Sequence, residues 1–87
     1  MLFLTSNSIF LFSYDVVIKN HNLFDIQLLS RYWHIQDGNG VVEEVRGPGV
    51  IGLKPIIKSD GVFKYSSFCP IKTPLGVMKG SYKMRNT

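Results

Sequence analysis

One candidate binding motif in this sequence is the glycine-rich stretch Arg46-Gly47-Pro48-Gly49-Val50-Ile51-Gly52. Its three glycines have the spacing G-x-G-x-x-G. In nucleotide-binding folds that spacing follows a strand, opens a helix and precedes an acidic residue about 20 positions later. Here Pro55 would interrupt such a helix, and Lys72 and Thr73 stand where the acid should be. The stretch therefore predicts a shaped loop between strands and disfavours a dinucleotide site.

The same loop could bind phosphate without any helix. Successive backbone amides of a glycine-rich turn can form a concave anion site, to which flanking cations add charge. The residues of this possible site are Arg46, Gly47, Gly49, Gly52 and Lys54. The alternative is purely conformational, because glycine supplies backbone dihedrals that other residues tolerate poorly. Both interpretations remain open at this point.

No nucleophile and base have the arrangement of a catalytic site. Cys69 is the one cysteine, and it could act as a nucleophile only beside a base such as His21 or His34, both distant in the sequence. Glu43 and Glu44 are neighbours in an expected strand and would point to opposite faces. No Cys or His pair has the spacing of zinc ligands. We therefore predict no catalytic activity, metal or cofactor, with Cys69 as a buried small residue.

Length and composition indicate one small globular domain. The 87 residues are 45% hydrophobic and 18% charged, which is typical of a folded chain and not of a disordered one. A single cysteine excludes an internal disulfide. The apolar N-terminus has no preceding Lys or Arg and is interrupted by polar residues 5–8, which fits neither a signal peptide nor a membrane span. We predict a cytoplasmic protein.

Positive charge is concentrated in the C-terminal part of the chain. Residues 1–53 contain three basic and five acidic residues, whereas residues 54–87 contain seven basic residues and one acidic residue. A possible basic face consists of Lys64, Lys79, Lys83 and Arg85. Such an asymmetry can attract an anionic partner. No exposed aromatic residue is expected among these cations, so a protein partner is favoured over nucleic acid, which binds by base stacking.

Alternating apolar and polar residues predict the strands that must position these groups. Strands are expected at residues 10–19, 26–36, 41–45, 55–58, 62–68 and 77–85. In the second of them Leu29, Trp33 and Ile35 share a face with Arg31, and Trp33 is expected in the core. Residues 69–76, with two prolines and a glycine, are expected to form a loop that crosses between sheets. About six strands without an amphipathic helix predict an antiparallel β-sandwich.

Several blocks of residues occur in an order that resembles the ApaG family. They include Phe12-Ser13-Tyr14, residues 27–33, residues 42–52, residues 63–67 and Gly80-Ser81-Tyr82. The resemblance runs from about Phe10 to Arg85 and implies an immunoglobulin or fibronectin type III-like sandwich. It divides the chain into a divergent N-terminal segment, residues 1–9, and an ApaG-like domain, residues 10–87. It also implies a bacterial binding module with no established catalytic activity.

Members of that family usually carry a further strand before Phe10 and another after the strand containing Tyr82, so the chain resembles a member shortened at both ends. We therefore predict an incomplete sandwich with an open sheet edge beside residues 77–84. Another chain, including a second copy, could pair with such an edge. The expected function is protein–protein interaction. The alternative is binding of phosphate, a nucleotide or nucleic acid by the glycine loop and the basic residues near the C-terminus.

Overall fold

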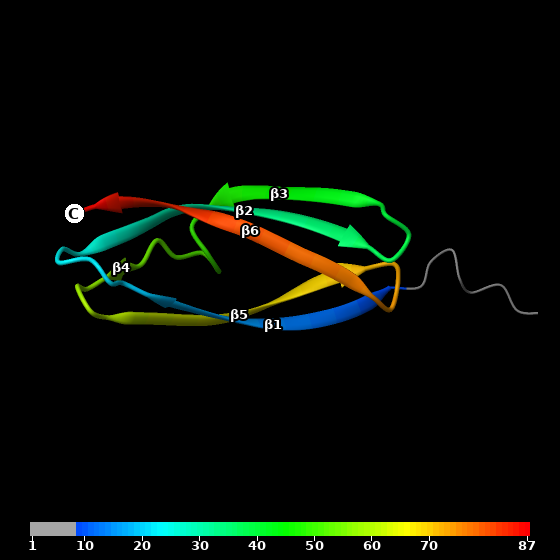
Figure 1. Ribbon diagram of the computed structural model, residues 1–87, viewed down its shortest axis with the longest axis horizontal. Helices are drawn as coiled ribbons and strands as arrows, with labels where there is room; N and C mark the ends of the chain where they lie inside the picture. The colour runs from blue at the N-terminus through cyan, green and yellow to red at the C-terminus, as the bar shows by residue number, and fades with distance from the viewer. Residues whose placement is uncertain (1–8) are drawn as a thin grey trace, which may run out of the picture.

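The computed structural model describes residues 9–87, which form six antiparallel strands in two facing sheets (Figure 1). The strands are β1 (Phe10–Lys19), β2 (Ile26–Asp37), β3 (Val42–Pro48), β4 (Ile56–Ile57), β5 (Val62–Ile71) and β6 (Gly76–Asn86). The first sheet pairs β1 with β5, and in the second β2 lies between β6 on one edge and β3 and β4 on the other. This sandwich confirms the predicted fold class. Residues 1–8 of the predicted N-terminal segment lie outside the described residues.

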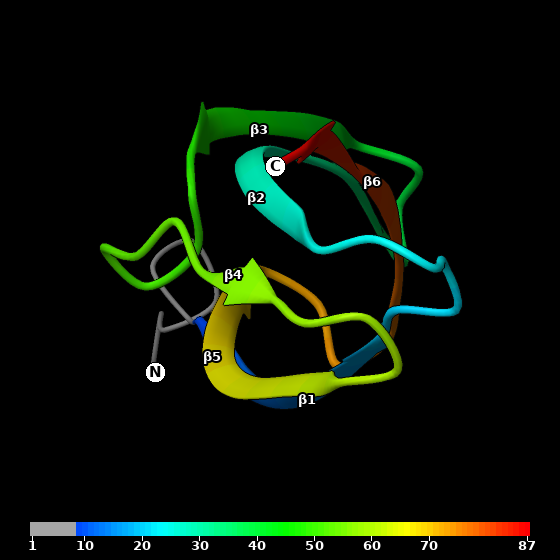
Figure 2. The same cartoon turned by 90° about the vertical axis from the view of Figure 1, so that its left-hand side faces the viewer.

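In the part of the chain that the structure describes, β6 is paired along one edge. Within residues 9–87 its partner is β2, from Gly76 opposite Asp37 to Asn86 opposite Ile26. β1 likewise pairs with β5 alone in that part of the chain. The end-on view shows the sheets as facing layers, with the short β4 drawn between them, above β5 (Figure 2). Within the described residues the other edge of β6, beside residues 77–84, therefore has no partner strand.

Strand β5 is longer than the sequence predicts. Cys69, Pro70 and Ile71 were expected in the crossing loop, but they continue β5. Their partners in β1 are, in the same order, Phe12, Leu11 and Phe10. A proline is tolerated here because β5 is an edge strand and can spare a ladder hydrogen bond. The loop that crosses to β6 is thereby reduced to residues 72–75.

A β-bulge in β2 changes which side chains face the core. The register with β6 shifts between Leu28 and Ser30, which leaves Leu29 as the extra residue. Leu28 is fully buried, whereas Leu29, expected on the core face with Trp33, is half-buried. Beyond the bulge Arg31 and Trp33 do face inward, as predicted. The alternation of the strand therefore holds on each side of the bulge but not across it.

The core between the sheets is thin and rich in aromatic rings. Leu28, Val50 and Tyr65 are buried together, and the half-buried residues packed on them are Tyr14, Val16, Ile18, Phe63, Tyr82 and Met84. The ring of Trp33 lies edge-on to Tyr14 at 5.6 Å and to Tyr82 at 6.0 Å between centroids. The hydroxyls of Tyr65 and Tyr82 are 2.6 Å apart and link the two sheets. Trp33 thus belongs to the core, as predicted.

Gly80 lies opposite Trp33 in the β2–β6 pair. A Cβ atom at Gly80 would lie 2.0 Å from the carbonyl oxygen of Tyr32 and 2.7 Å from the Trp33 ring. We expect Gly80→Ala to lower the free energy of unfolding by about 1–3 kcal/mol in urea denaturation, as overpacking usually does. The control is Ser81→Ala at the next, exposed position, which should change it by less than about 0.5 kcal/mol. Equal stability of Gly80→Ala and the unmodified protein would contradict this packing.

The paired tyrosines make stability sensitive to high pH. Burial, and then the hydrogen bond to Tyr82, raise the pKa of Tyr65 far above its usual value, and burial raises the pKa of Tyr82. In the unfolded chain a tyrosine titrates near pH 10, so above that pH the folded state binds more protons. The free energy of unfolding is then unaffected by these groups below about pH 10 and falls as pH rises further.

Denaturation in urea between about pH 8 and pH 11 measures this fall. Tyr65→Phe should reduce the slope above pH 10, whereas the control Tyr32→Phe, on the outer face of the other sheet, should keep it. The same slope in Tyr65→Phe as in the unmodified protein would show that the hydroxyl pair is not its source.

Candidate functional site

The glycine loop joins β3 to β4 and folds back onto β2. The amide of Gly49 donates a hydrogen bond to the carbonyl oxygen of Leu29, and the amide of Val50 donates to that of Leu53, both at 2.8 Å. Val50 is fully buried, and Gly49 is buried with a φ of 60°. A Cβ atom at Gly49 would lie 2.1 Å from the Leu53 carbonyl oxygen, so this position requires glycine. A phosphate held by these two amides would first have to displace internal hydrogen bonds.

Arg31 holds this loop against β2. Its Nη1 donates hydrogen bonds to the carbonyl oxygens of Pro48, at 3.1 Å, and Gly49, at 3.0 Å. The guanidinium lies against Gly47, where a Cβ atom would be 3.0 Å from Nη1. Sequence reasoning assigned Arg31 no role. The signal was its place on the core face beside Trp33, since a charged group there needs polar partners.

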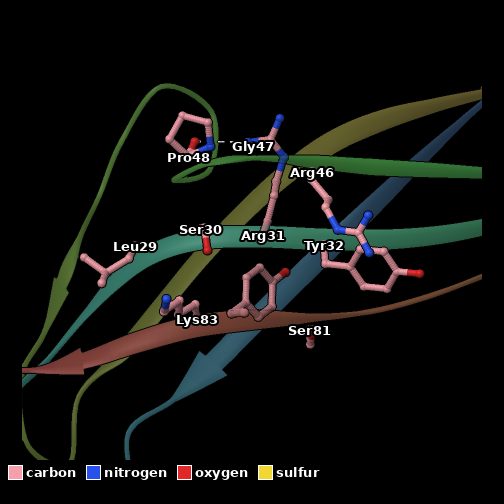
Figure 3. Close-up of a pocket in the computed structure, with 10 residues that line it drawn as sticks. Leu29, Ser30, Arg31, Tyr32, Arg46, Gly47, Pro48, Ser81 and Lys83 are labelled. Atoms are coloured by element: carbon pink, nitrogen blue, oxygen red, sulfur yellow. Dashed lines mark hydrogen bonds between the residues drawn. The ribbon is translucent and has the colours of Figure 1, made fainter.

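Arg46 and the remaining residues of the predicted anion site lie apart from these amides. The guanidinium carbon of Arg46 lies 4.5 Å from the centroid of the Tyr32 ring, and its Nη1 lies 3.1 Å from Oε2 of Glu44. Figure 3 shows Arg46 beside Tyr32, while Arg31 reaches toward Pro48. Gly52 lies in the exposed turn after Val50, with a φ of 76°, and Lys54 is exposed. The loop geometry therefore favours the conformational role of the glycines.

The predicted basic face divides between the two sheets. Lys79, Lys83 and Arg85 are exposed at alternate positions of β6, on the outer face of its sheet. Lys64 is exposed on β5, in the other sheet, between Phe63 and Tyr65, which face the core. Since the outer faces of two stacked sheets lie on opposite sides of the molecule, Lys64 belongs to a different surface. This corrects the expectation of one basic face.

Aromatic side chains do occur among the cations of β6, contrary to the sequence-based expectation. Tyr32 lies opposite Ser81 on β6 and Arg46 on β3, and His34 lies opposite Lys79 and Glu44. Both face outward because Trp33, between them, faces the core. An open groove of about 590 Å³ crosses this stretch of sheet (Figure 3). The residues that line the groove include Ser30, Tyr32, Arg46, Ser81 and Lys83.

Cys69 lies buried on β5, opposite Phe12. Burial, and then the negative charge of Glu43, raise the pKa of its thiol, so the reactive thiolate is disfavoured. His34 faces away from it on the outer side of the other sheet, and His21 is exposed in the turn after β1. Within residues 9–87 no three His, Cys, Asp or Glu side chains gather as metal ligands. That part of the chain also contains no helix able to cross a membrane.

Comparison with known proteins places this fold and loop in a family. The ApaG domain matches residues 4–86. The chain belongs to the ApaG family. It is 49% identical over 78 residues to Protein ApaG of Sinorhizobium fredii, covering 90% of this chain and 60% of that relative. It is also 49% identical over 75 residues to Protein ApaG of Edwardsiella ictaluri, covering 86% of this chain and 60% of that relative.

Solved structures agree with this assignment. An X-ray structure of a structural genomics target has a TM-score of 0.88 and 38% identity, covering 90% of this chain and 59% of that one. A crystal structure of a protein from Bordetella pertussis has a TM-score of 0.87 and 40% identity, covering 94% of this chain and 67% of that one. The resemblance to ApaG proteins found from the sequence is thereby confirmed. The chain spans about 60% of the length of the curated relatives that it matches.

Arg31 and Arg46 provide a matched pair of substitutions. Arg31→Met keeps the aliphatic stem but leaves the carbonyls of Pro48 and Gly49 without their donor, so we expect a loss of about 1–3 kcal/mol of unfolding free energy. Amide exchange at Val50 should also become faster. Arg46→Met removes an exposed ion pair and should cost less than about 1 kcal/mol, with Val50 unchanged. If both variants were equally stable, Arg31 would not be the residue that holds the loop.

Proposed function

We propose that this ApaG-family chain is a non-catalytic binding module that takes up an extended segment of a partner protein along the free edge of β6. The supporting observation is that β6 pairs with β2 over 11 residues while, within residues 9–87, its other edge has no partner strand. Free backbone N–H and C=O groups on such an edge accept an added strand, which is a recurring mode of peptide recognition.

An apolar cleft lies between this edge and β1. It has a volume of about 190 Å³, and its lining residues are Phe12, Tyr14, Ile35, Cys69, Ile71, Gly76, Val77 and Met78. Phe12 lies on the inner face of β1, opposite buried Cys69, yet it is 41% exposed. Because successive side chains of a strand alternate in direction, a strand added to β6 would turn every second side chain toward this cleft. Apolar residues at those positions would cover Phe12.

The positive charge on the outer face of β6 favours acidic residues on the outward-facing side of the added strand. Lys79, Lys83 and Arg85 point outward, and cross-strand neighbours of opposite charge stabilise a pair while like charges destabilise it. Self-association through β6 would bring two such cationic rows together. The partner segment that fits best therefore alternates acidic and apolar residues, and a second copy of this chain is the less favourable occupant.

Amide hydrogen exchange of β6 tests this proposal with two peptides of about eight residues, one alternating Glu with Val and the other alternating Lys with Val. The Glu peptide should slow exchange of the β6 amides, and the Lys peptide should not. Met78→Lys, which places a charge beside the cleft, should weaken the protection by at least about fivefold. The control Val17→Lys, at an exposed position of β1, should leave it unchanged.

Two results would contradict the proposal. Neither peptide protecting β6 would show that the edge is not a binding site. Protection that appears without peptide and grows with protein concentration would identify a second copy as the occupant.

A further inference from the structure

We propose that the outer face of β2 and β6 binds single-stranded nucleic acid, with the backbone along the cations of β6 and a base stacked on Tyr32. This inference goes beyond the strand-binding function and does not depend on it. The surface is called the Tyr32 face below. It consists of Tyr32, His34 and Arg46 together with Lys79, Ser81, Lys83 and Arg85.

The polar side chains that β6 contributes to the Tyr32 face follow a regular spacing. Lys79, Ser81, Lys83 and Arg85 occupy alternate positions of β6 and are all exposed. Alternate residues of a strand are about 6.7 Å apart. That distance is close to the separation of successive phosphates in an extended single strand. A phosphate backbone running along β6 would therefore meet a cation or a hydroxyl at each step.

Tyr32 supplies a stacking platform beside this row. It lies opposite Ser81, in the middle of the cations, and its ring is half-buried on the outer face. The guanidinium of Arg46 covers one side of the ring at 4.5 Å (Figure 3). Nucleobases stack both on tyrosine rings and on the planes of arginine guanidinium groups. His34, beside Lys79, continues the aromatic row along β2.

Among the described strand positions of this face, negative charge is confined to one. At the outer-face positions of β2, β3 and β6 the acidic residue is Glu44, which pairs with Arg46 at 3.1 Å. Both side chains of that pair remain substantially exposed, so Arg46 can exchange Glu44 for a phosphate at little cost. Unlike a phosphate site at the glycine loop, binding here displaces no backbone hydrogen bond.

Fluorescence anisotropy of a labelled oligo(dT) of about fifteen nucleotides, titrated with the protein at several salt concentrations, tests the proposal. Lys83→Gln should weaken binding and reduce the slope of log K against log salt by about 1. The matched control is Lys64→Gln, the same charge change on the opposite surface, which should leave affinity and slope unchanged. Glu44→Gln should strengthen binding, because it frees Arg46 and removes a negative charge.

The stacking step has its own pair of variants. Tyr32→Leu should weaken binding of oligo(dT) about tenfold, whereas Tyr32→Phe, which keeps the ring, should retain it. Inorganic polyphosphate serves as the comparison ligand, since it offers phosphates without bases and its binding should not depend on Tyr32. A thermal melt of each variant is the check that it folds, and Lys83→Gln and Lys64→Gln test the proposal independently of Tyr32.

Three outcomes would overturn the proposal. No binding of oligo(dT) at low salt would exclude the site. Equal losses in Lys64→Gln and Lys83→Gln would show attraction by net charge alone. Equal affinity of Tyr32→Leu and Tyr32→Phe, with polyphosphate binding as tightly as oligo(dT), would show a phosphate-binding surface that does not recognise bases.

Discussion

The close approach of the Trp33 ring to the backbone of Gly80 sets the register on which the second sheet depends. A side chain at position 80 would collide with the Tyr32 carbonyl and the indole ring. A slip of one residue between β2 and β6 would place Lys79 or Ser81 at that point and turn every β6 side chain to the opposite face. The row of cations beside Tyr32 is therefore a consequence of one packing contact in the core.

That core is shallow because each sheet offers few inward positions. The Nε1 of Trp33 is the buried side-chain polar atom without a hydrogen-bond partner in residues 9–87, and such an atom costs free energy unless a ligand or water satisfies it. Phe12 and Phe10 face the interior side of β1 and yet are each 41% exposed. A strand added to the free edge of β6 would at the same time cover the exposed apolar surface of Phe12. Binding there would stabilise the domain as well as the partner.

Local chemistry made much of the fold predictable. Asp37 accepts hydrogen bonds from the amides of the hairpin turn that follows it, and Asn20 accepts one from the amide of Asn22 in the turn after β1. These are properties of short stretches, which a sequence displays. The bulge at Leu29, the partners of Arg31 and the place of Tyr32 beside β6 depend on which strands pair and in what register. β2 and β6 are far apart in the sequence, and neither strand's own residues indicate that the two pair or in what register.

The glycine spacing illustrates the same distinction between pattern and context. In a phosphate-binding loop the backbone presents N–H groups to a negative charge. Here Pro48 and Gly49 present carbonyl oxygens to the positive charge of Arg31, which is the opposite polarity. The amides of Gly49 and Val50 are meanwhile used within the chain. The loop is thus arranged around a cation that the protein itself provides. The cationic side chains on the outer face of β6 are exposed and do not bond to the loop. They are therefore better placed than the loop to bind an anion.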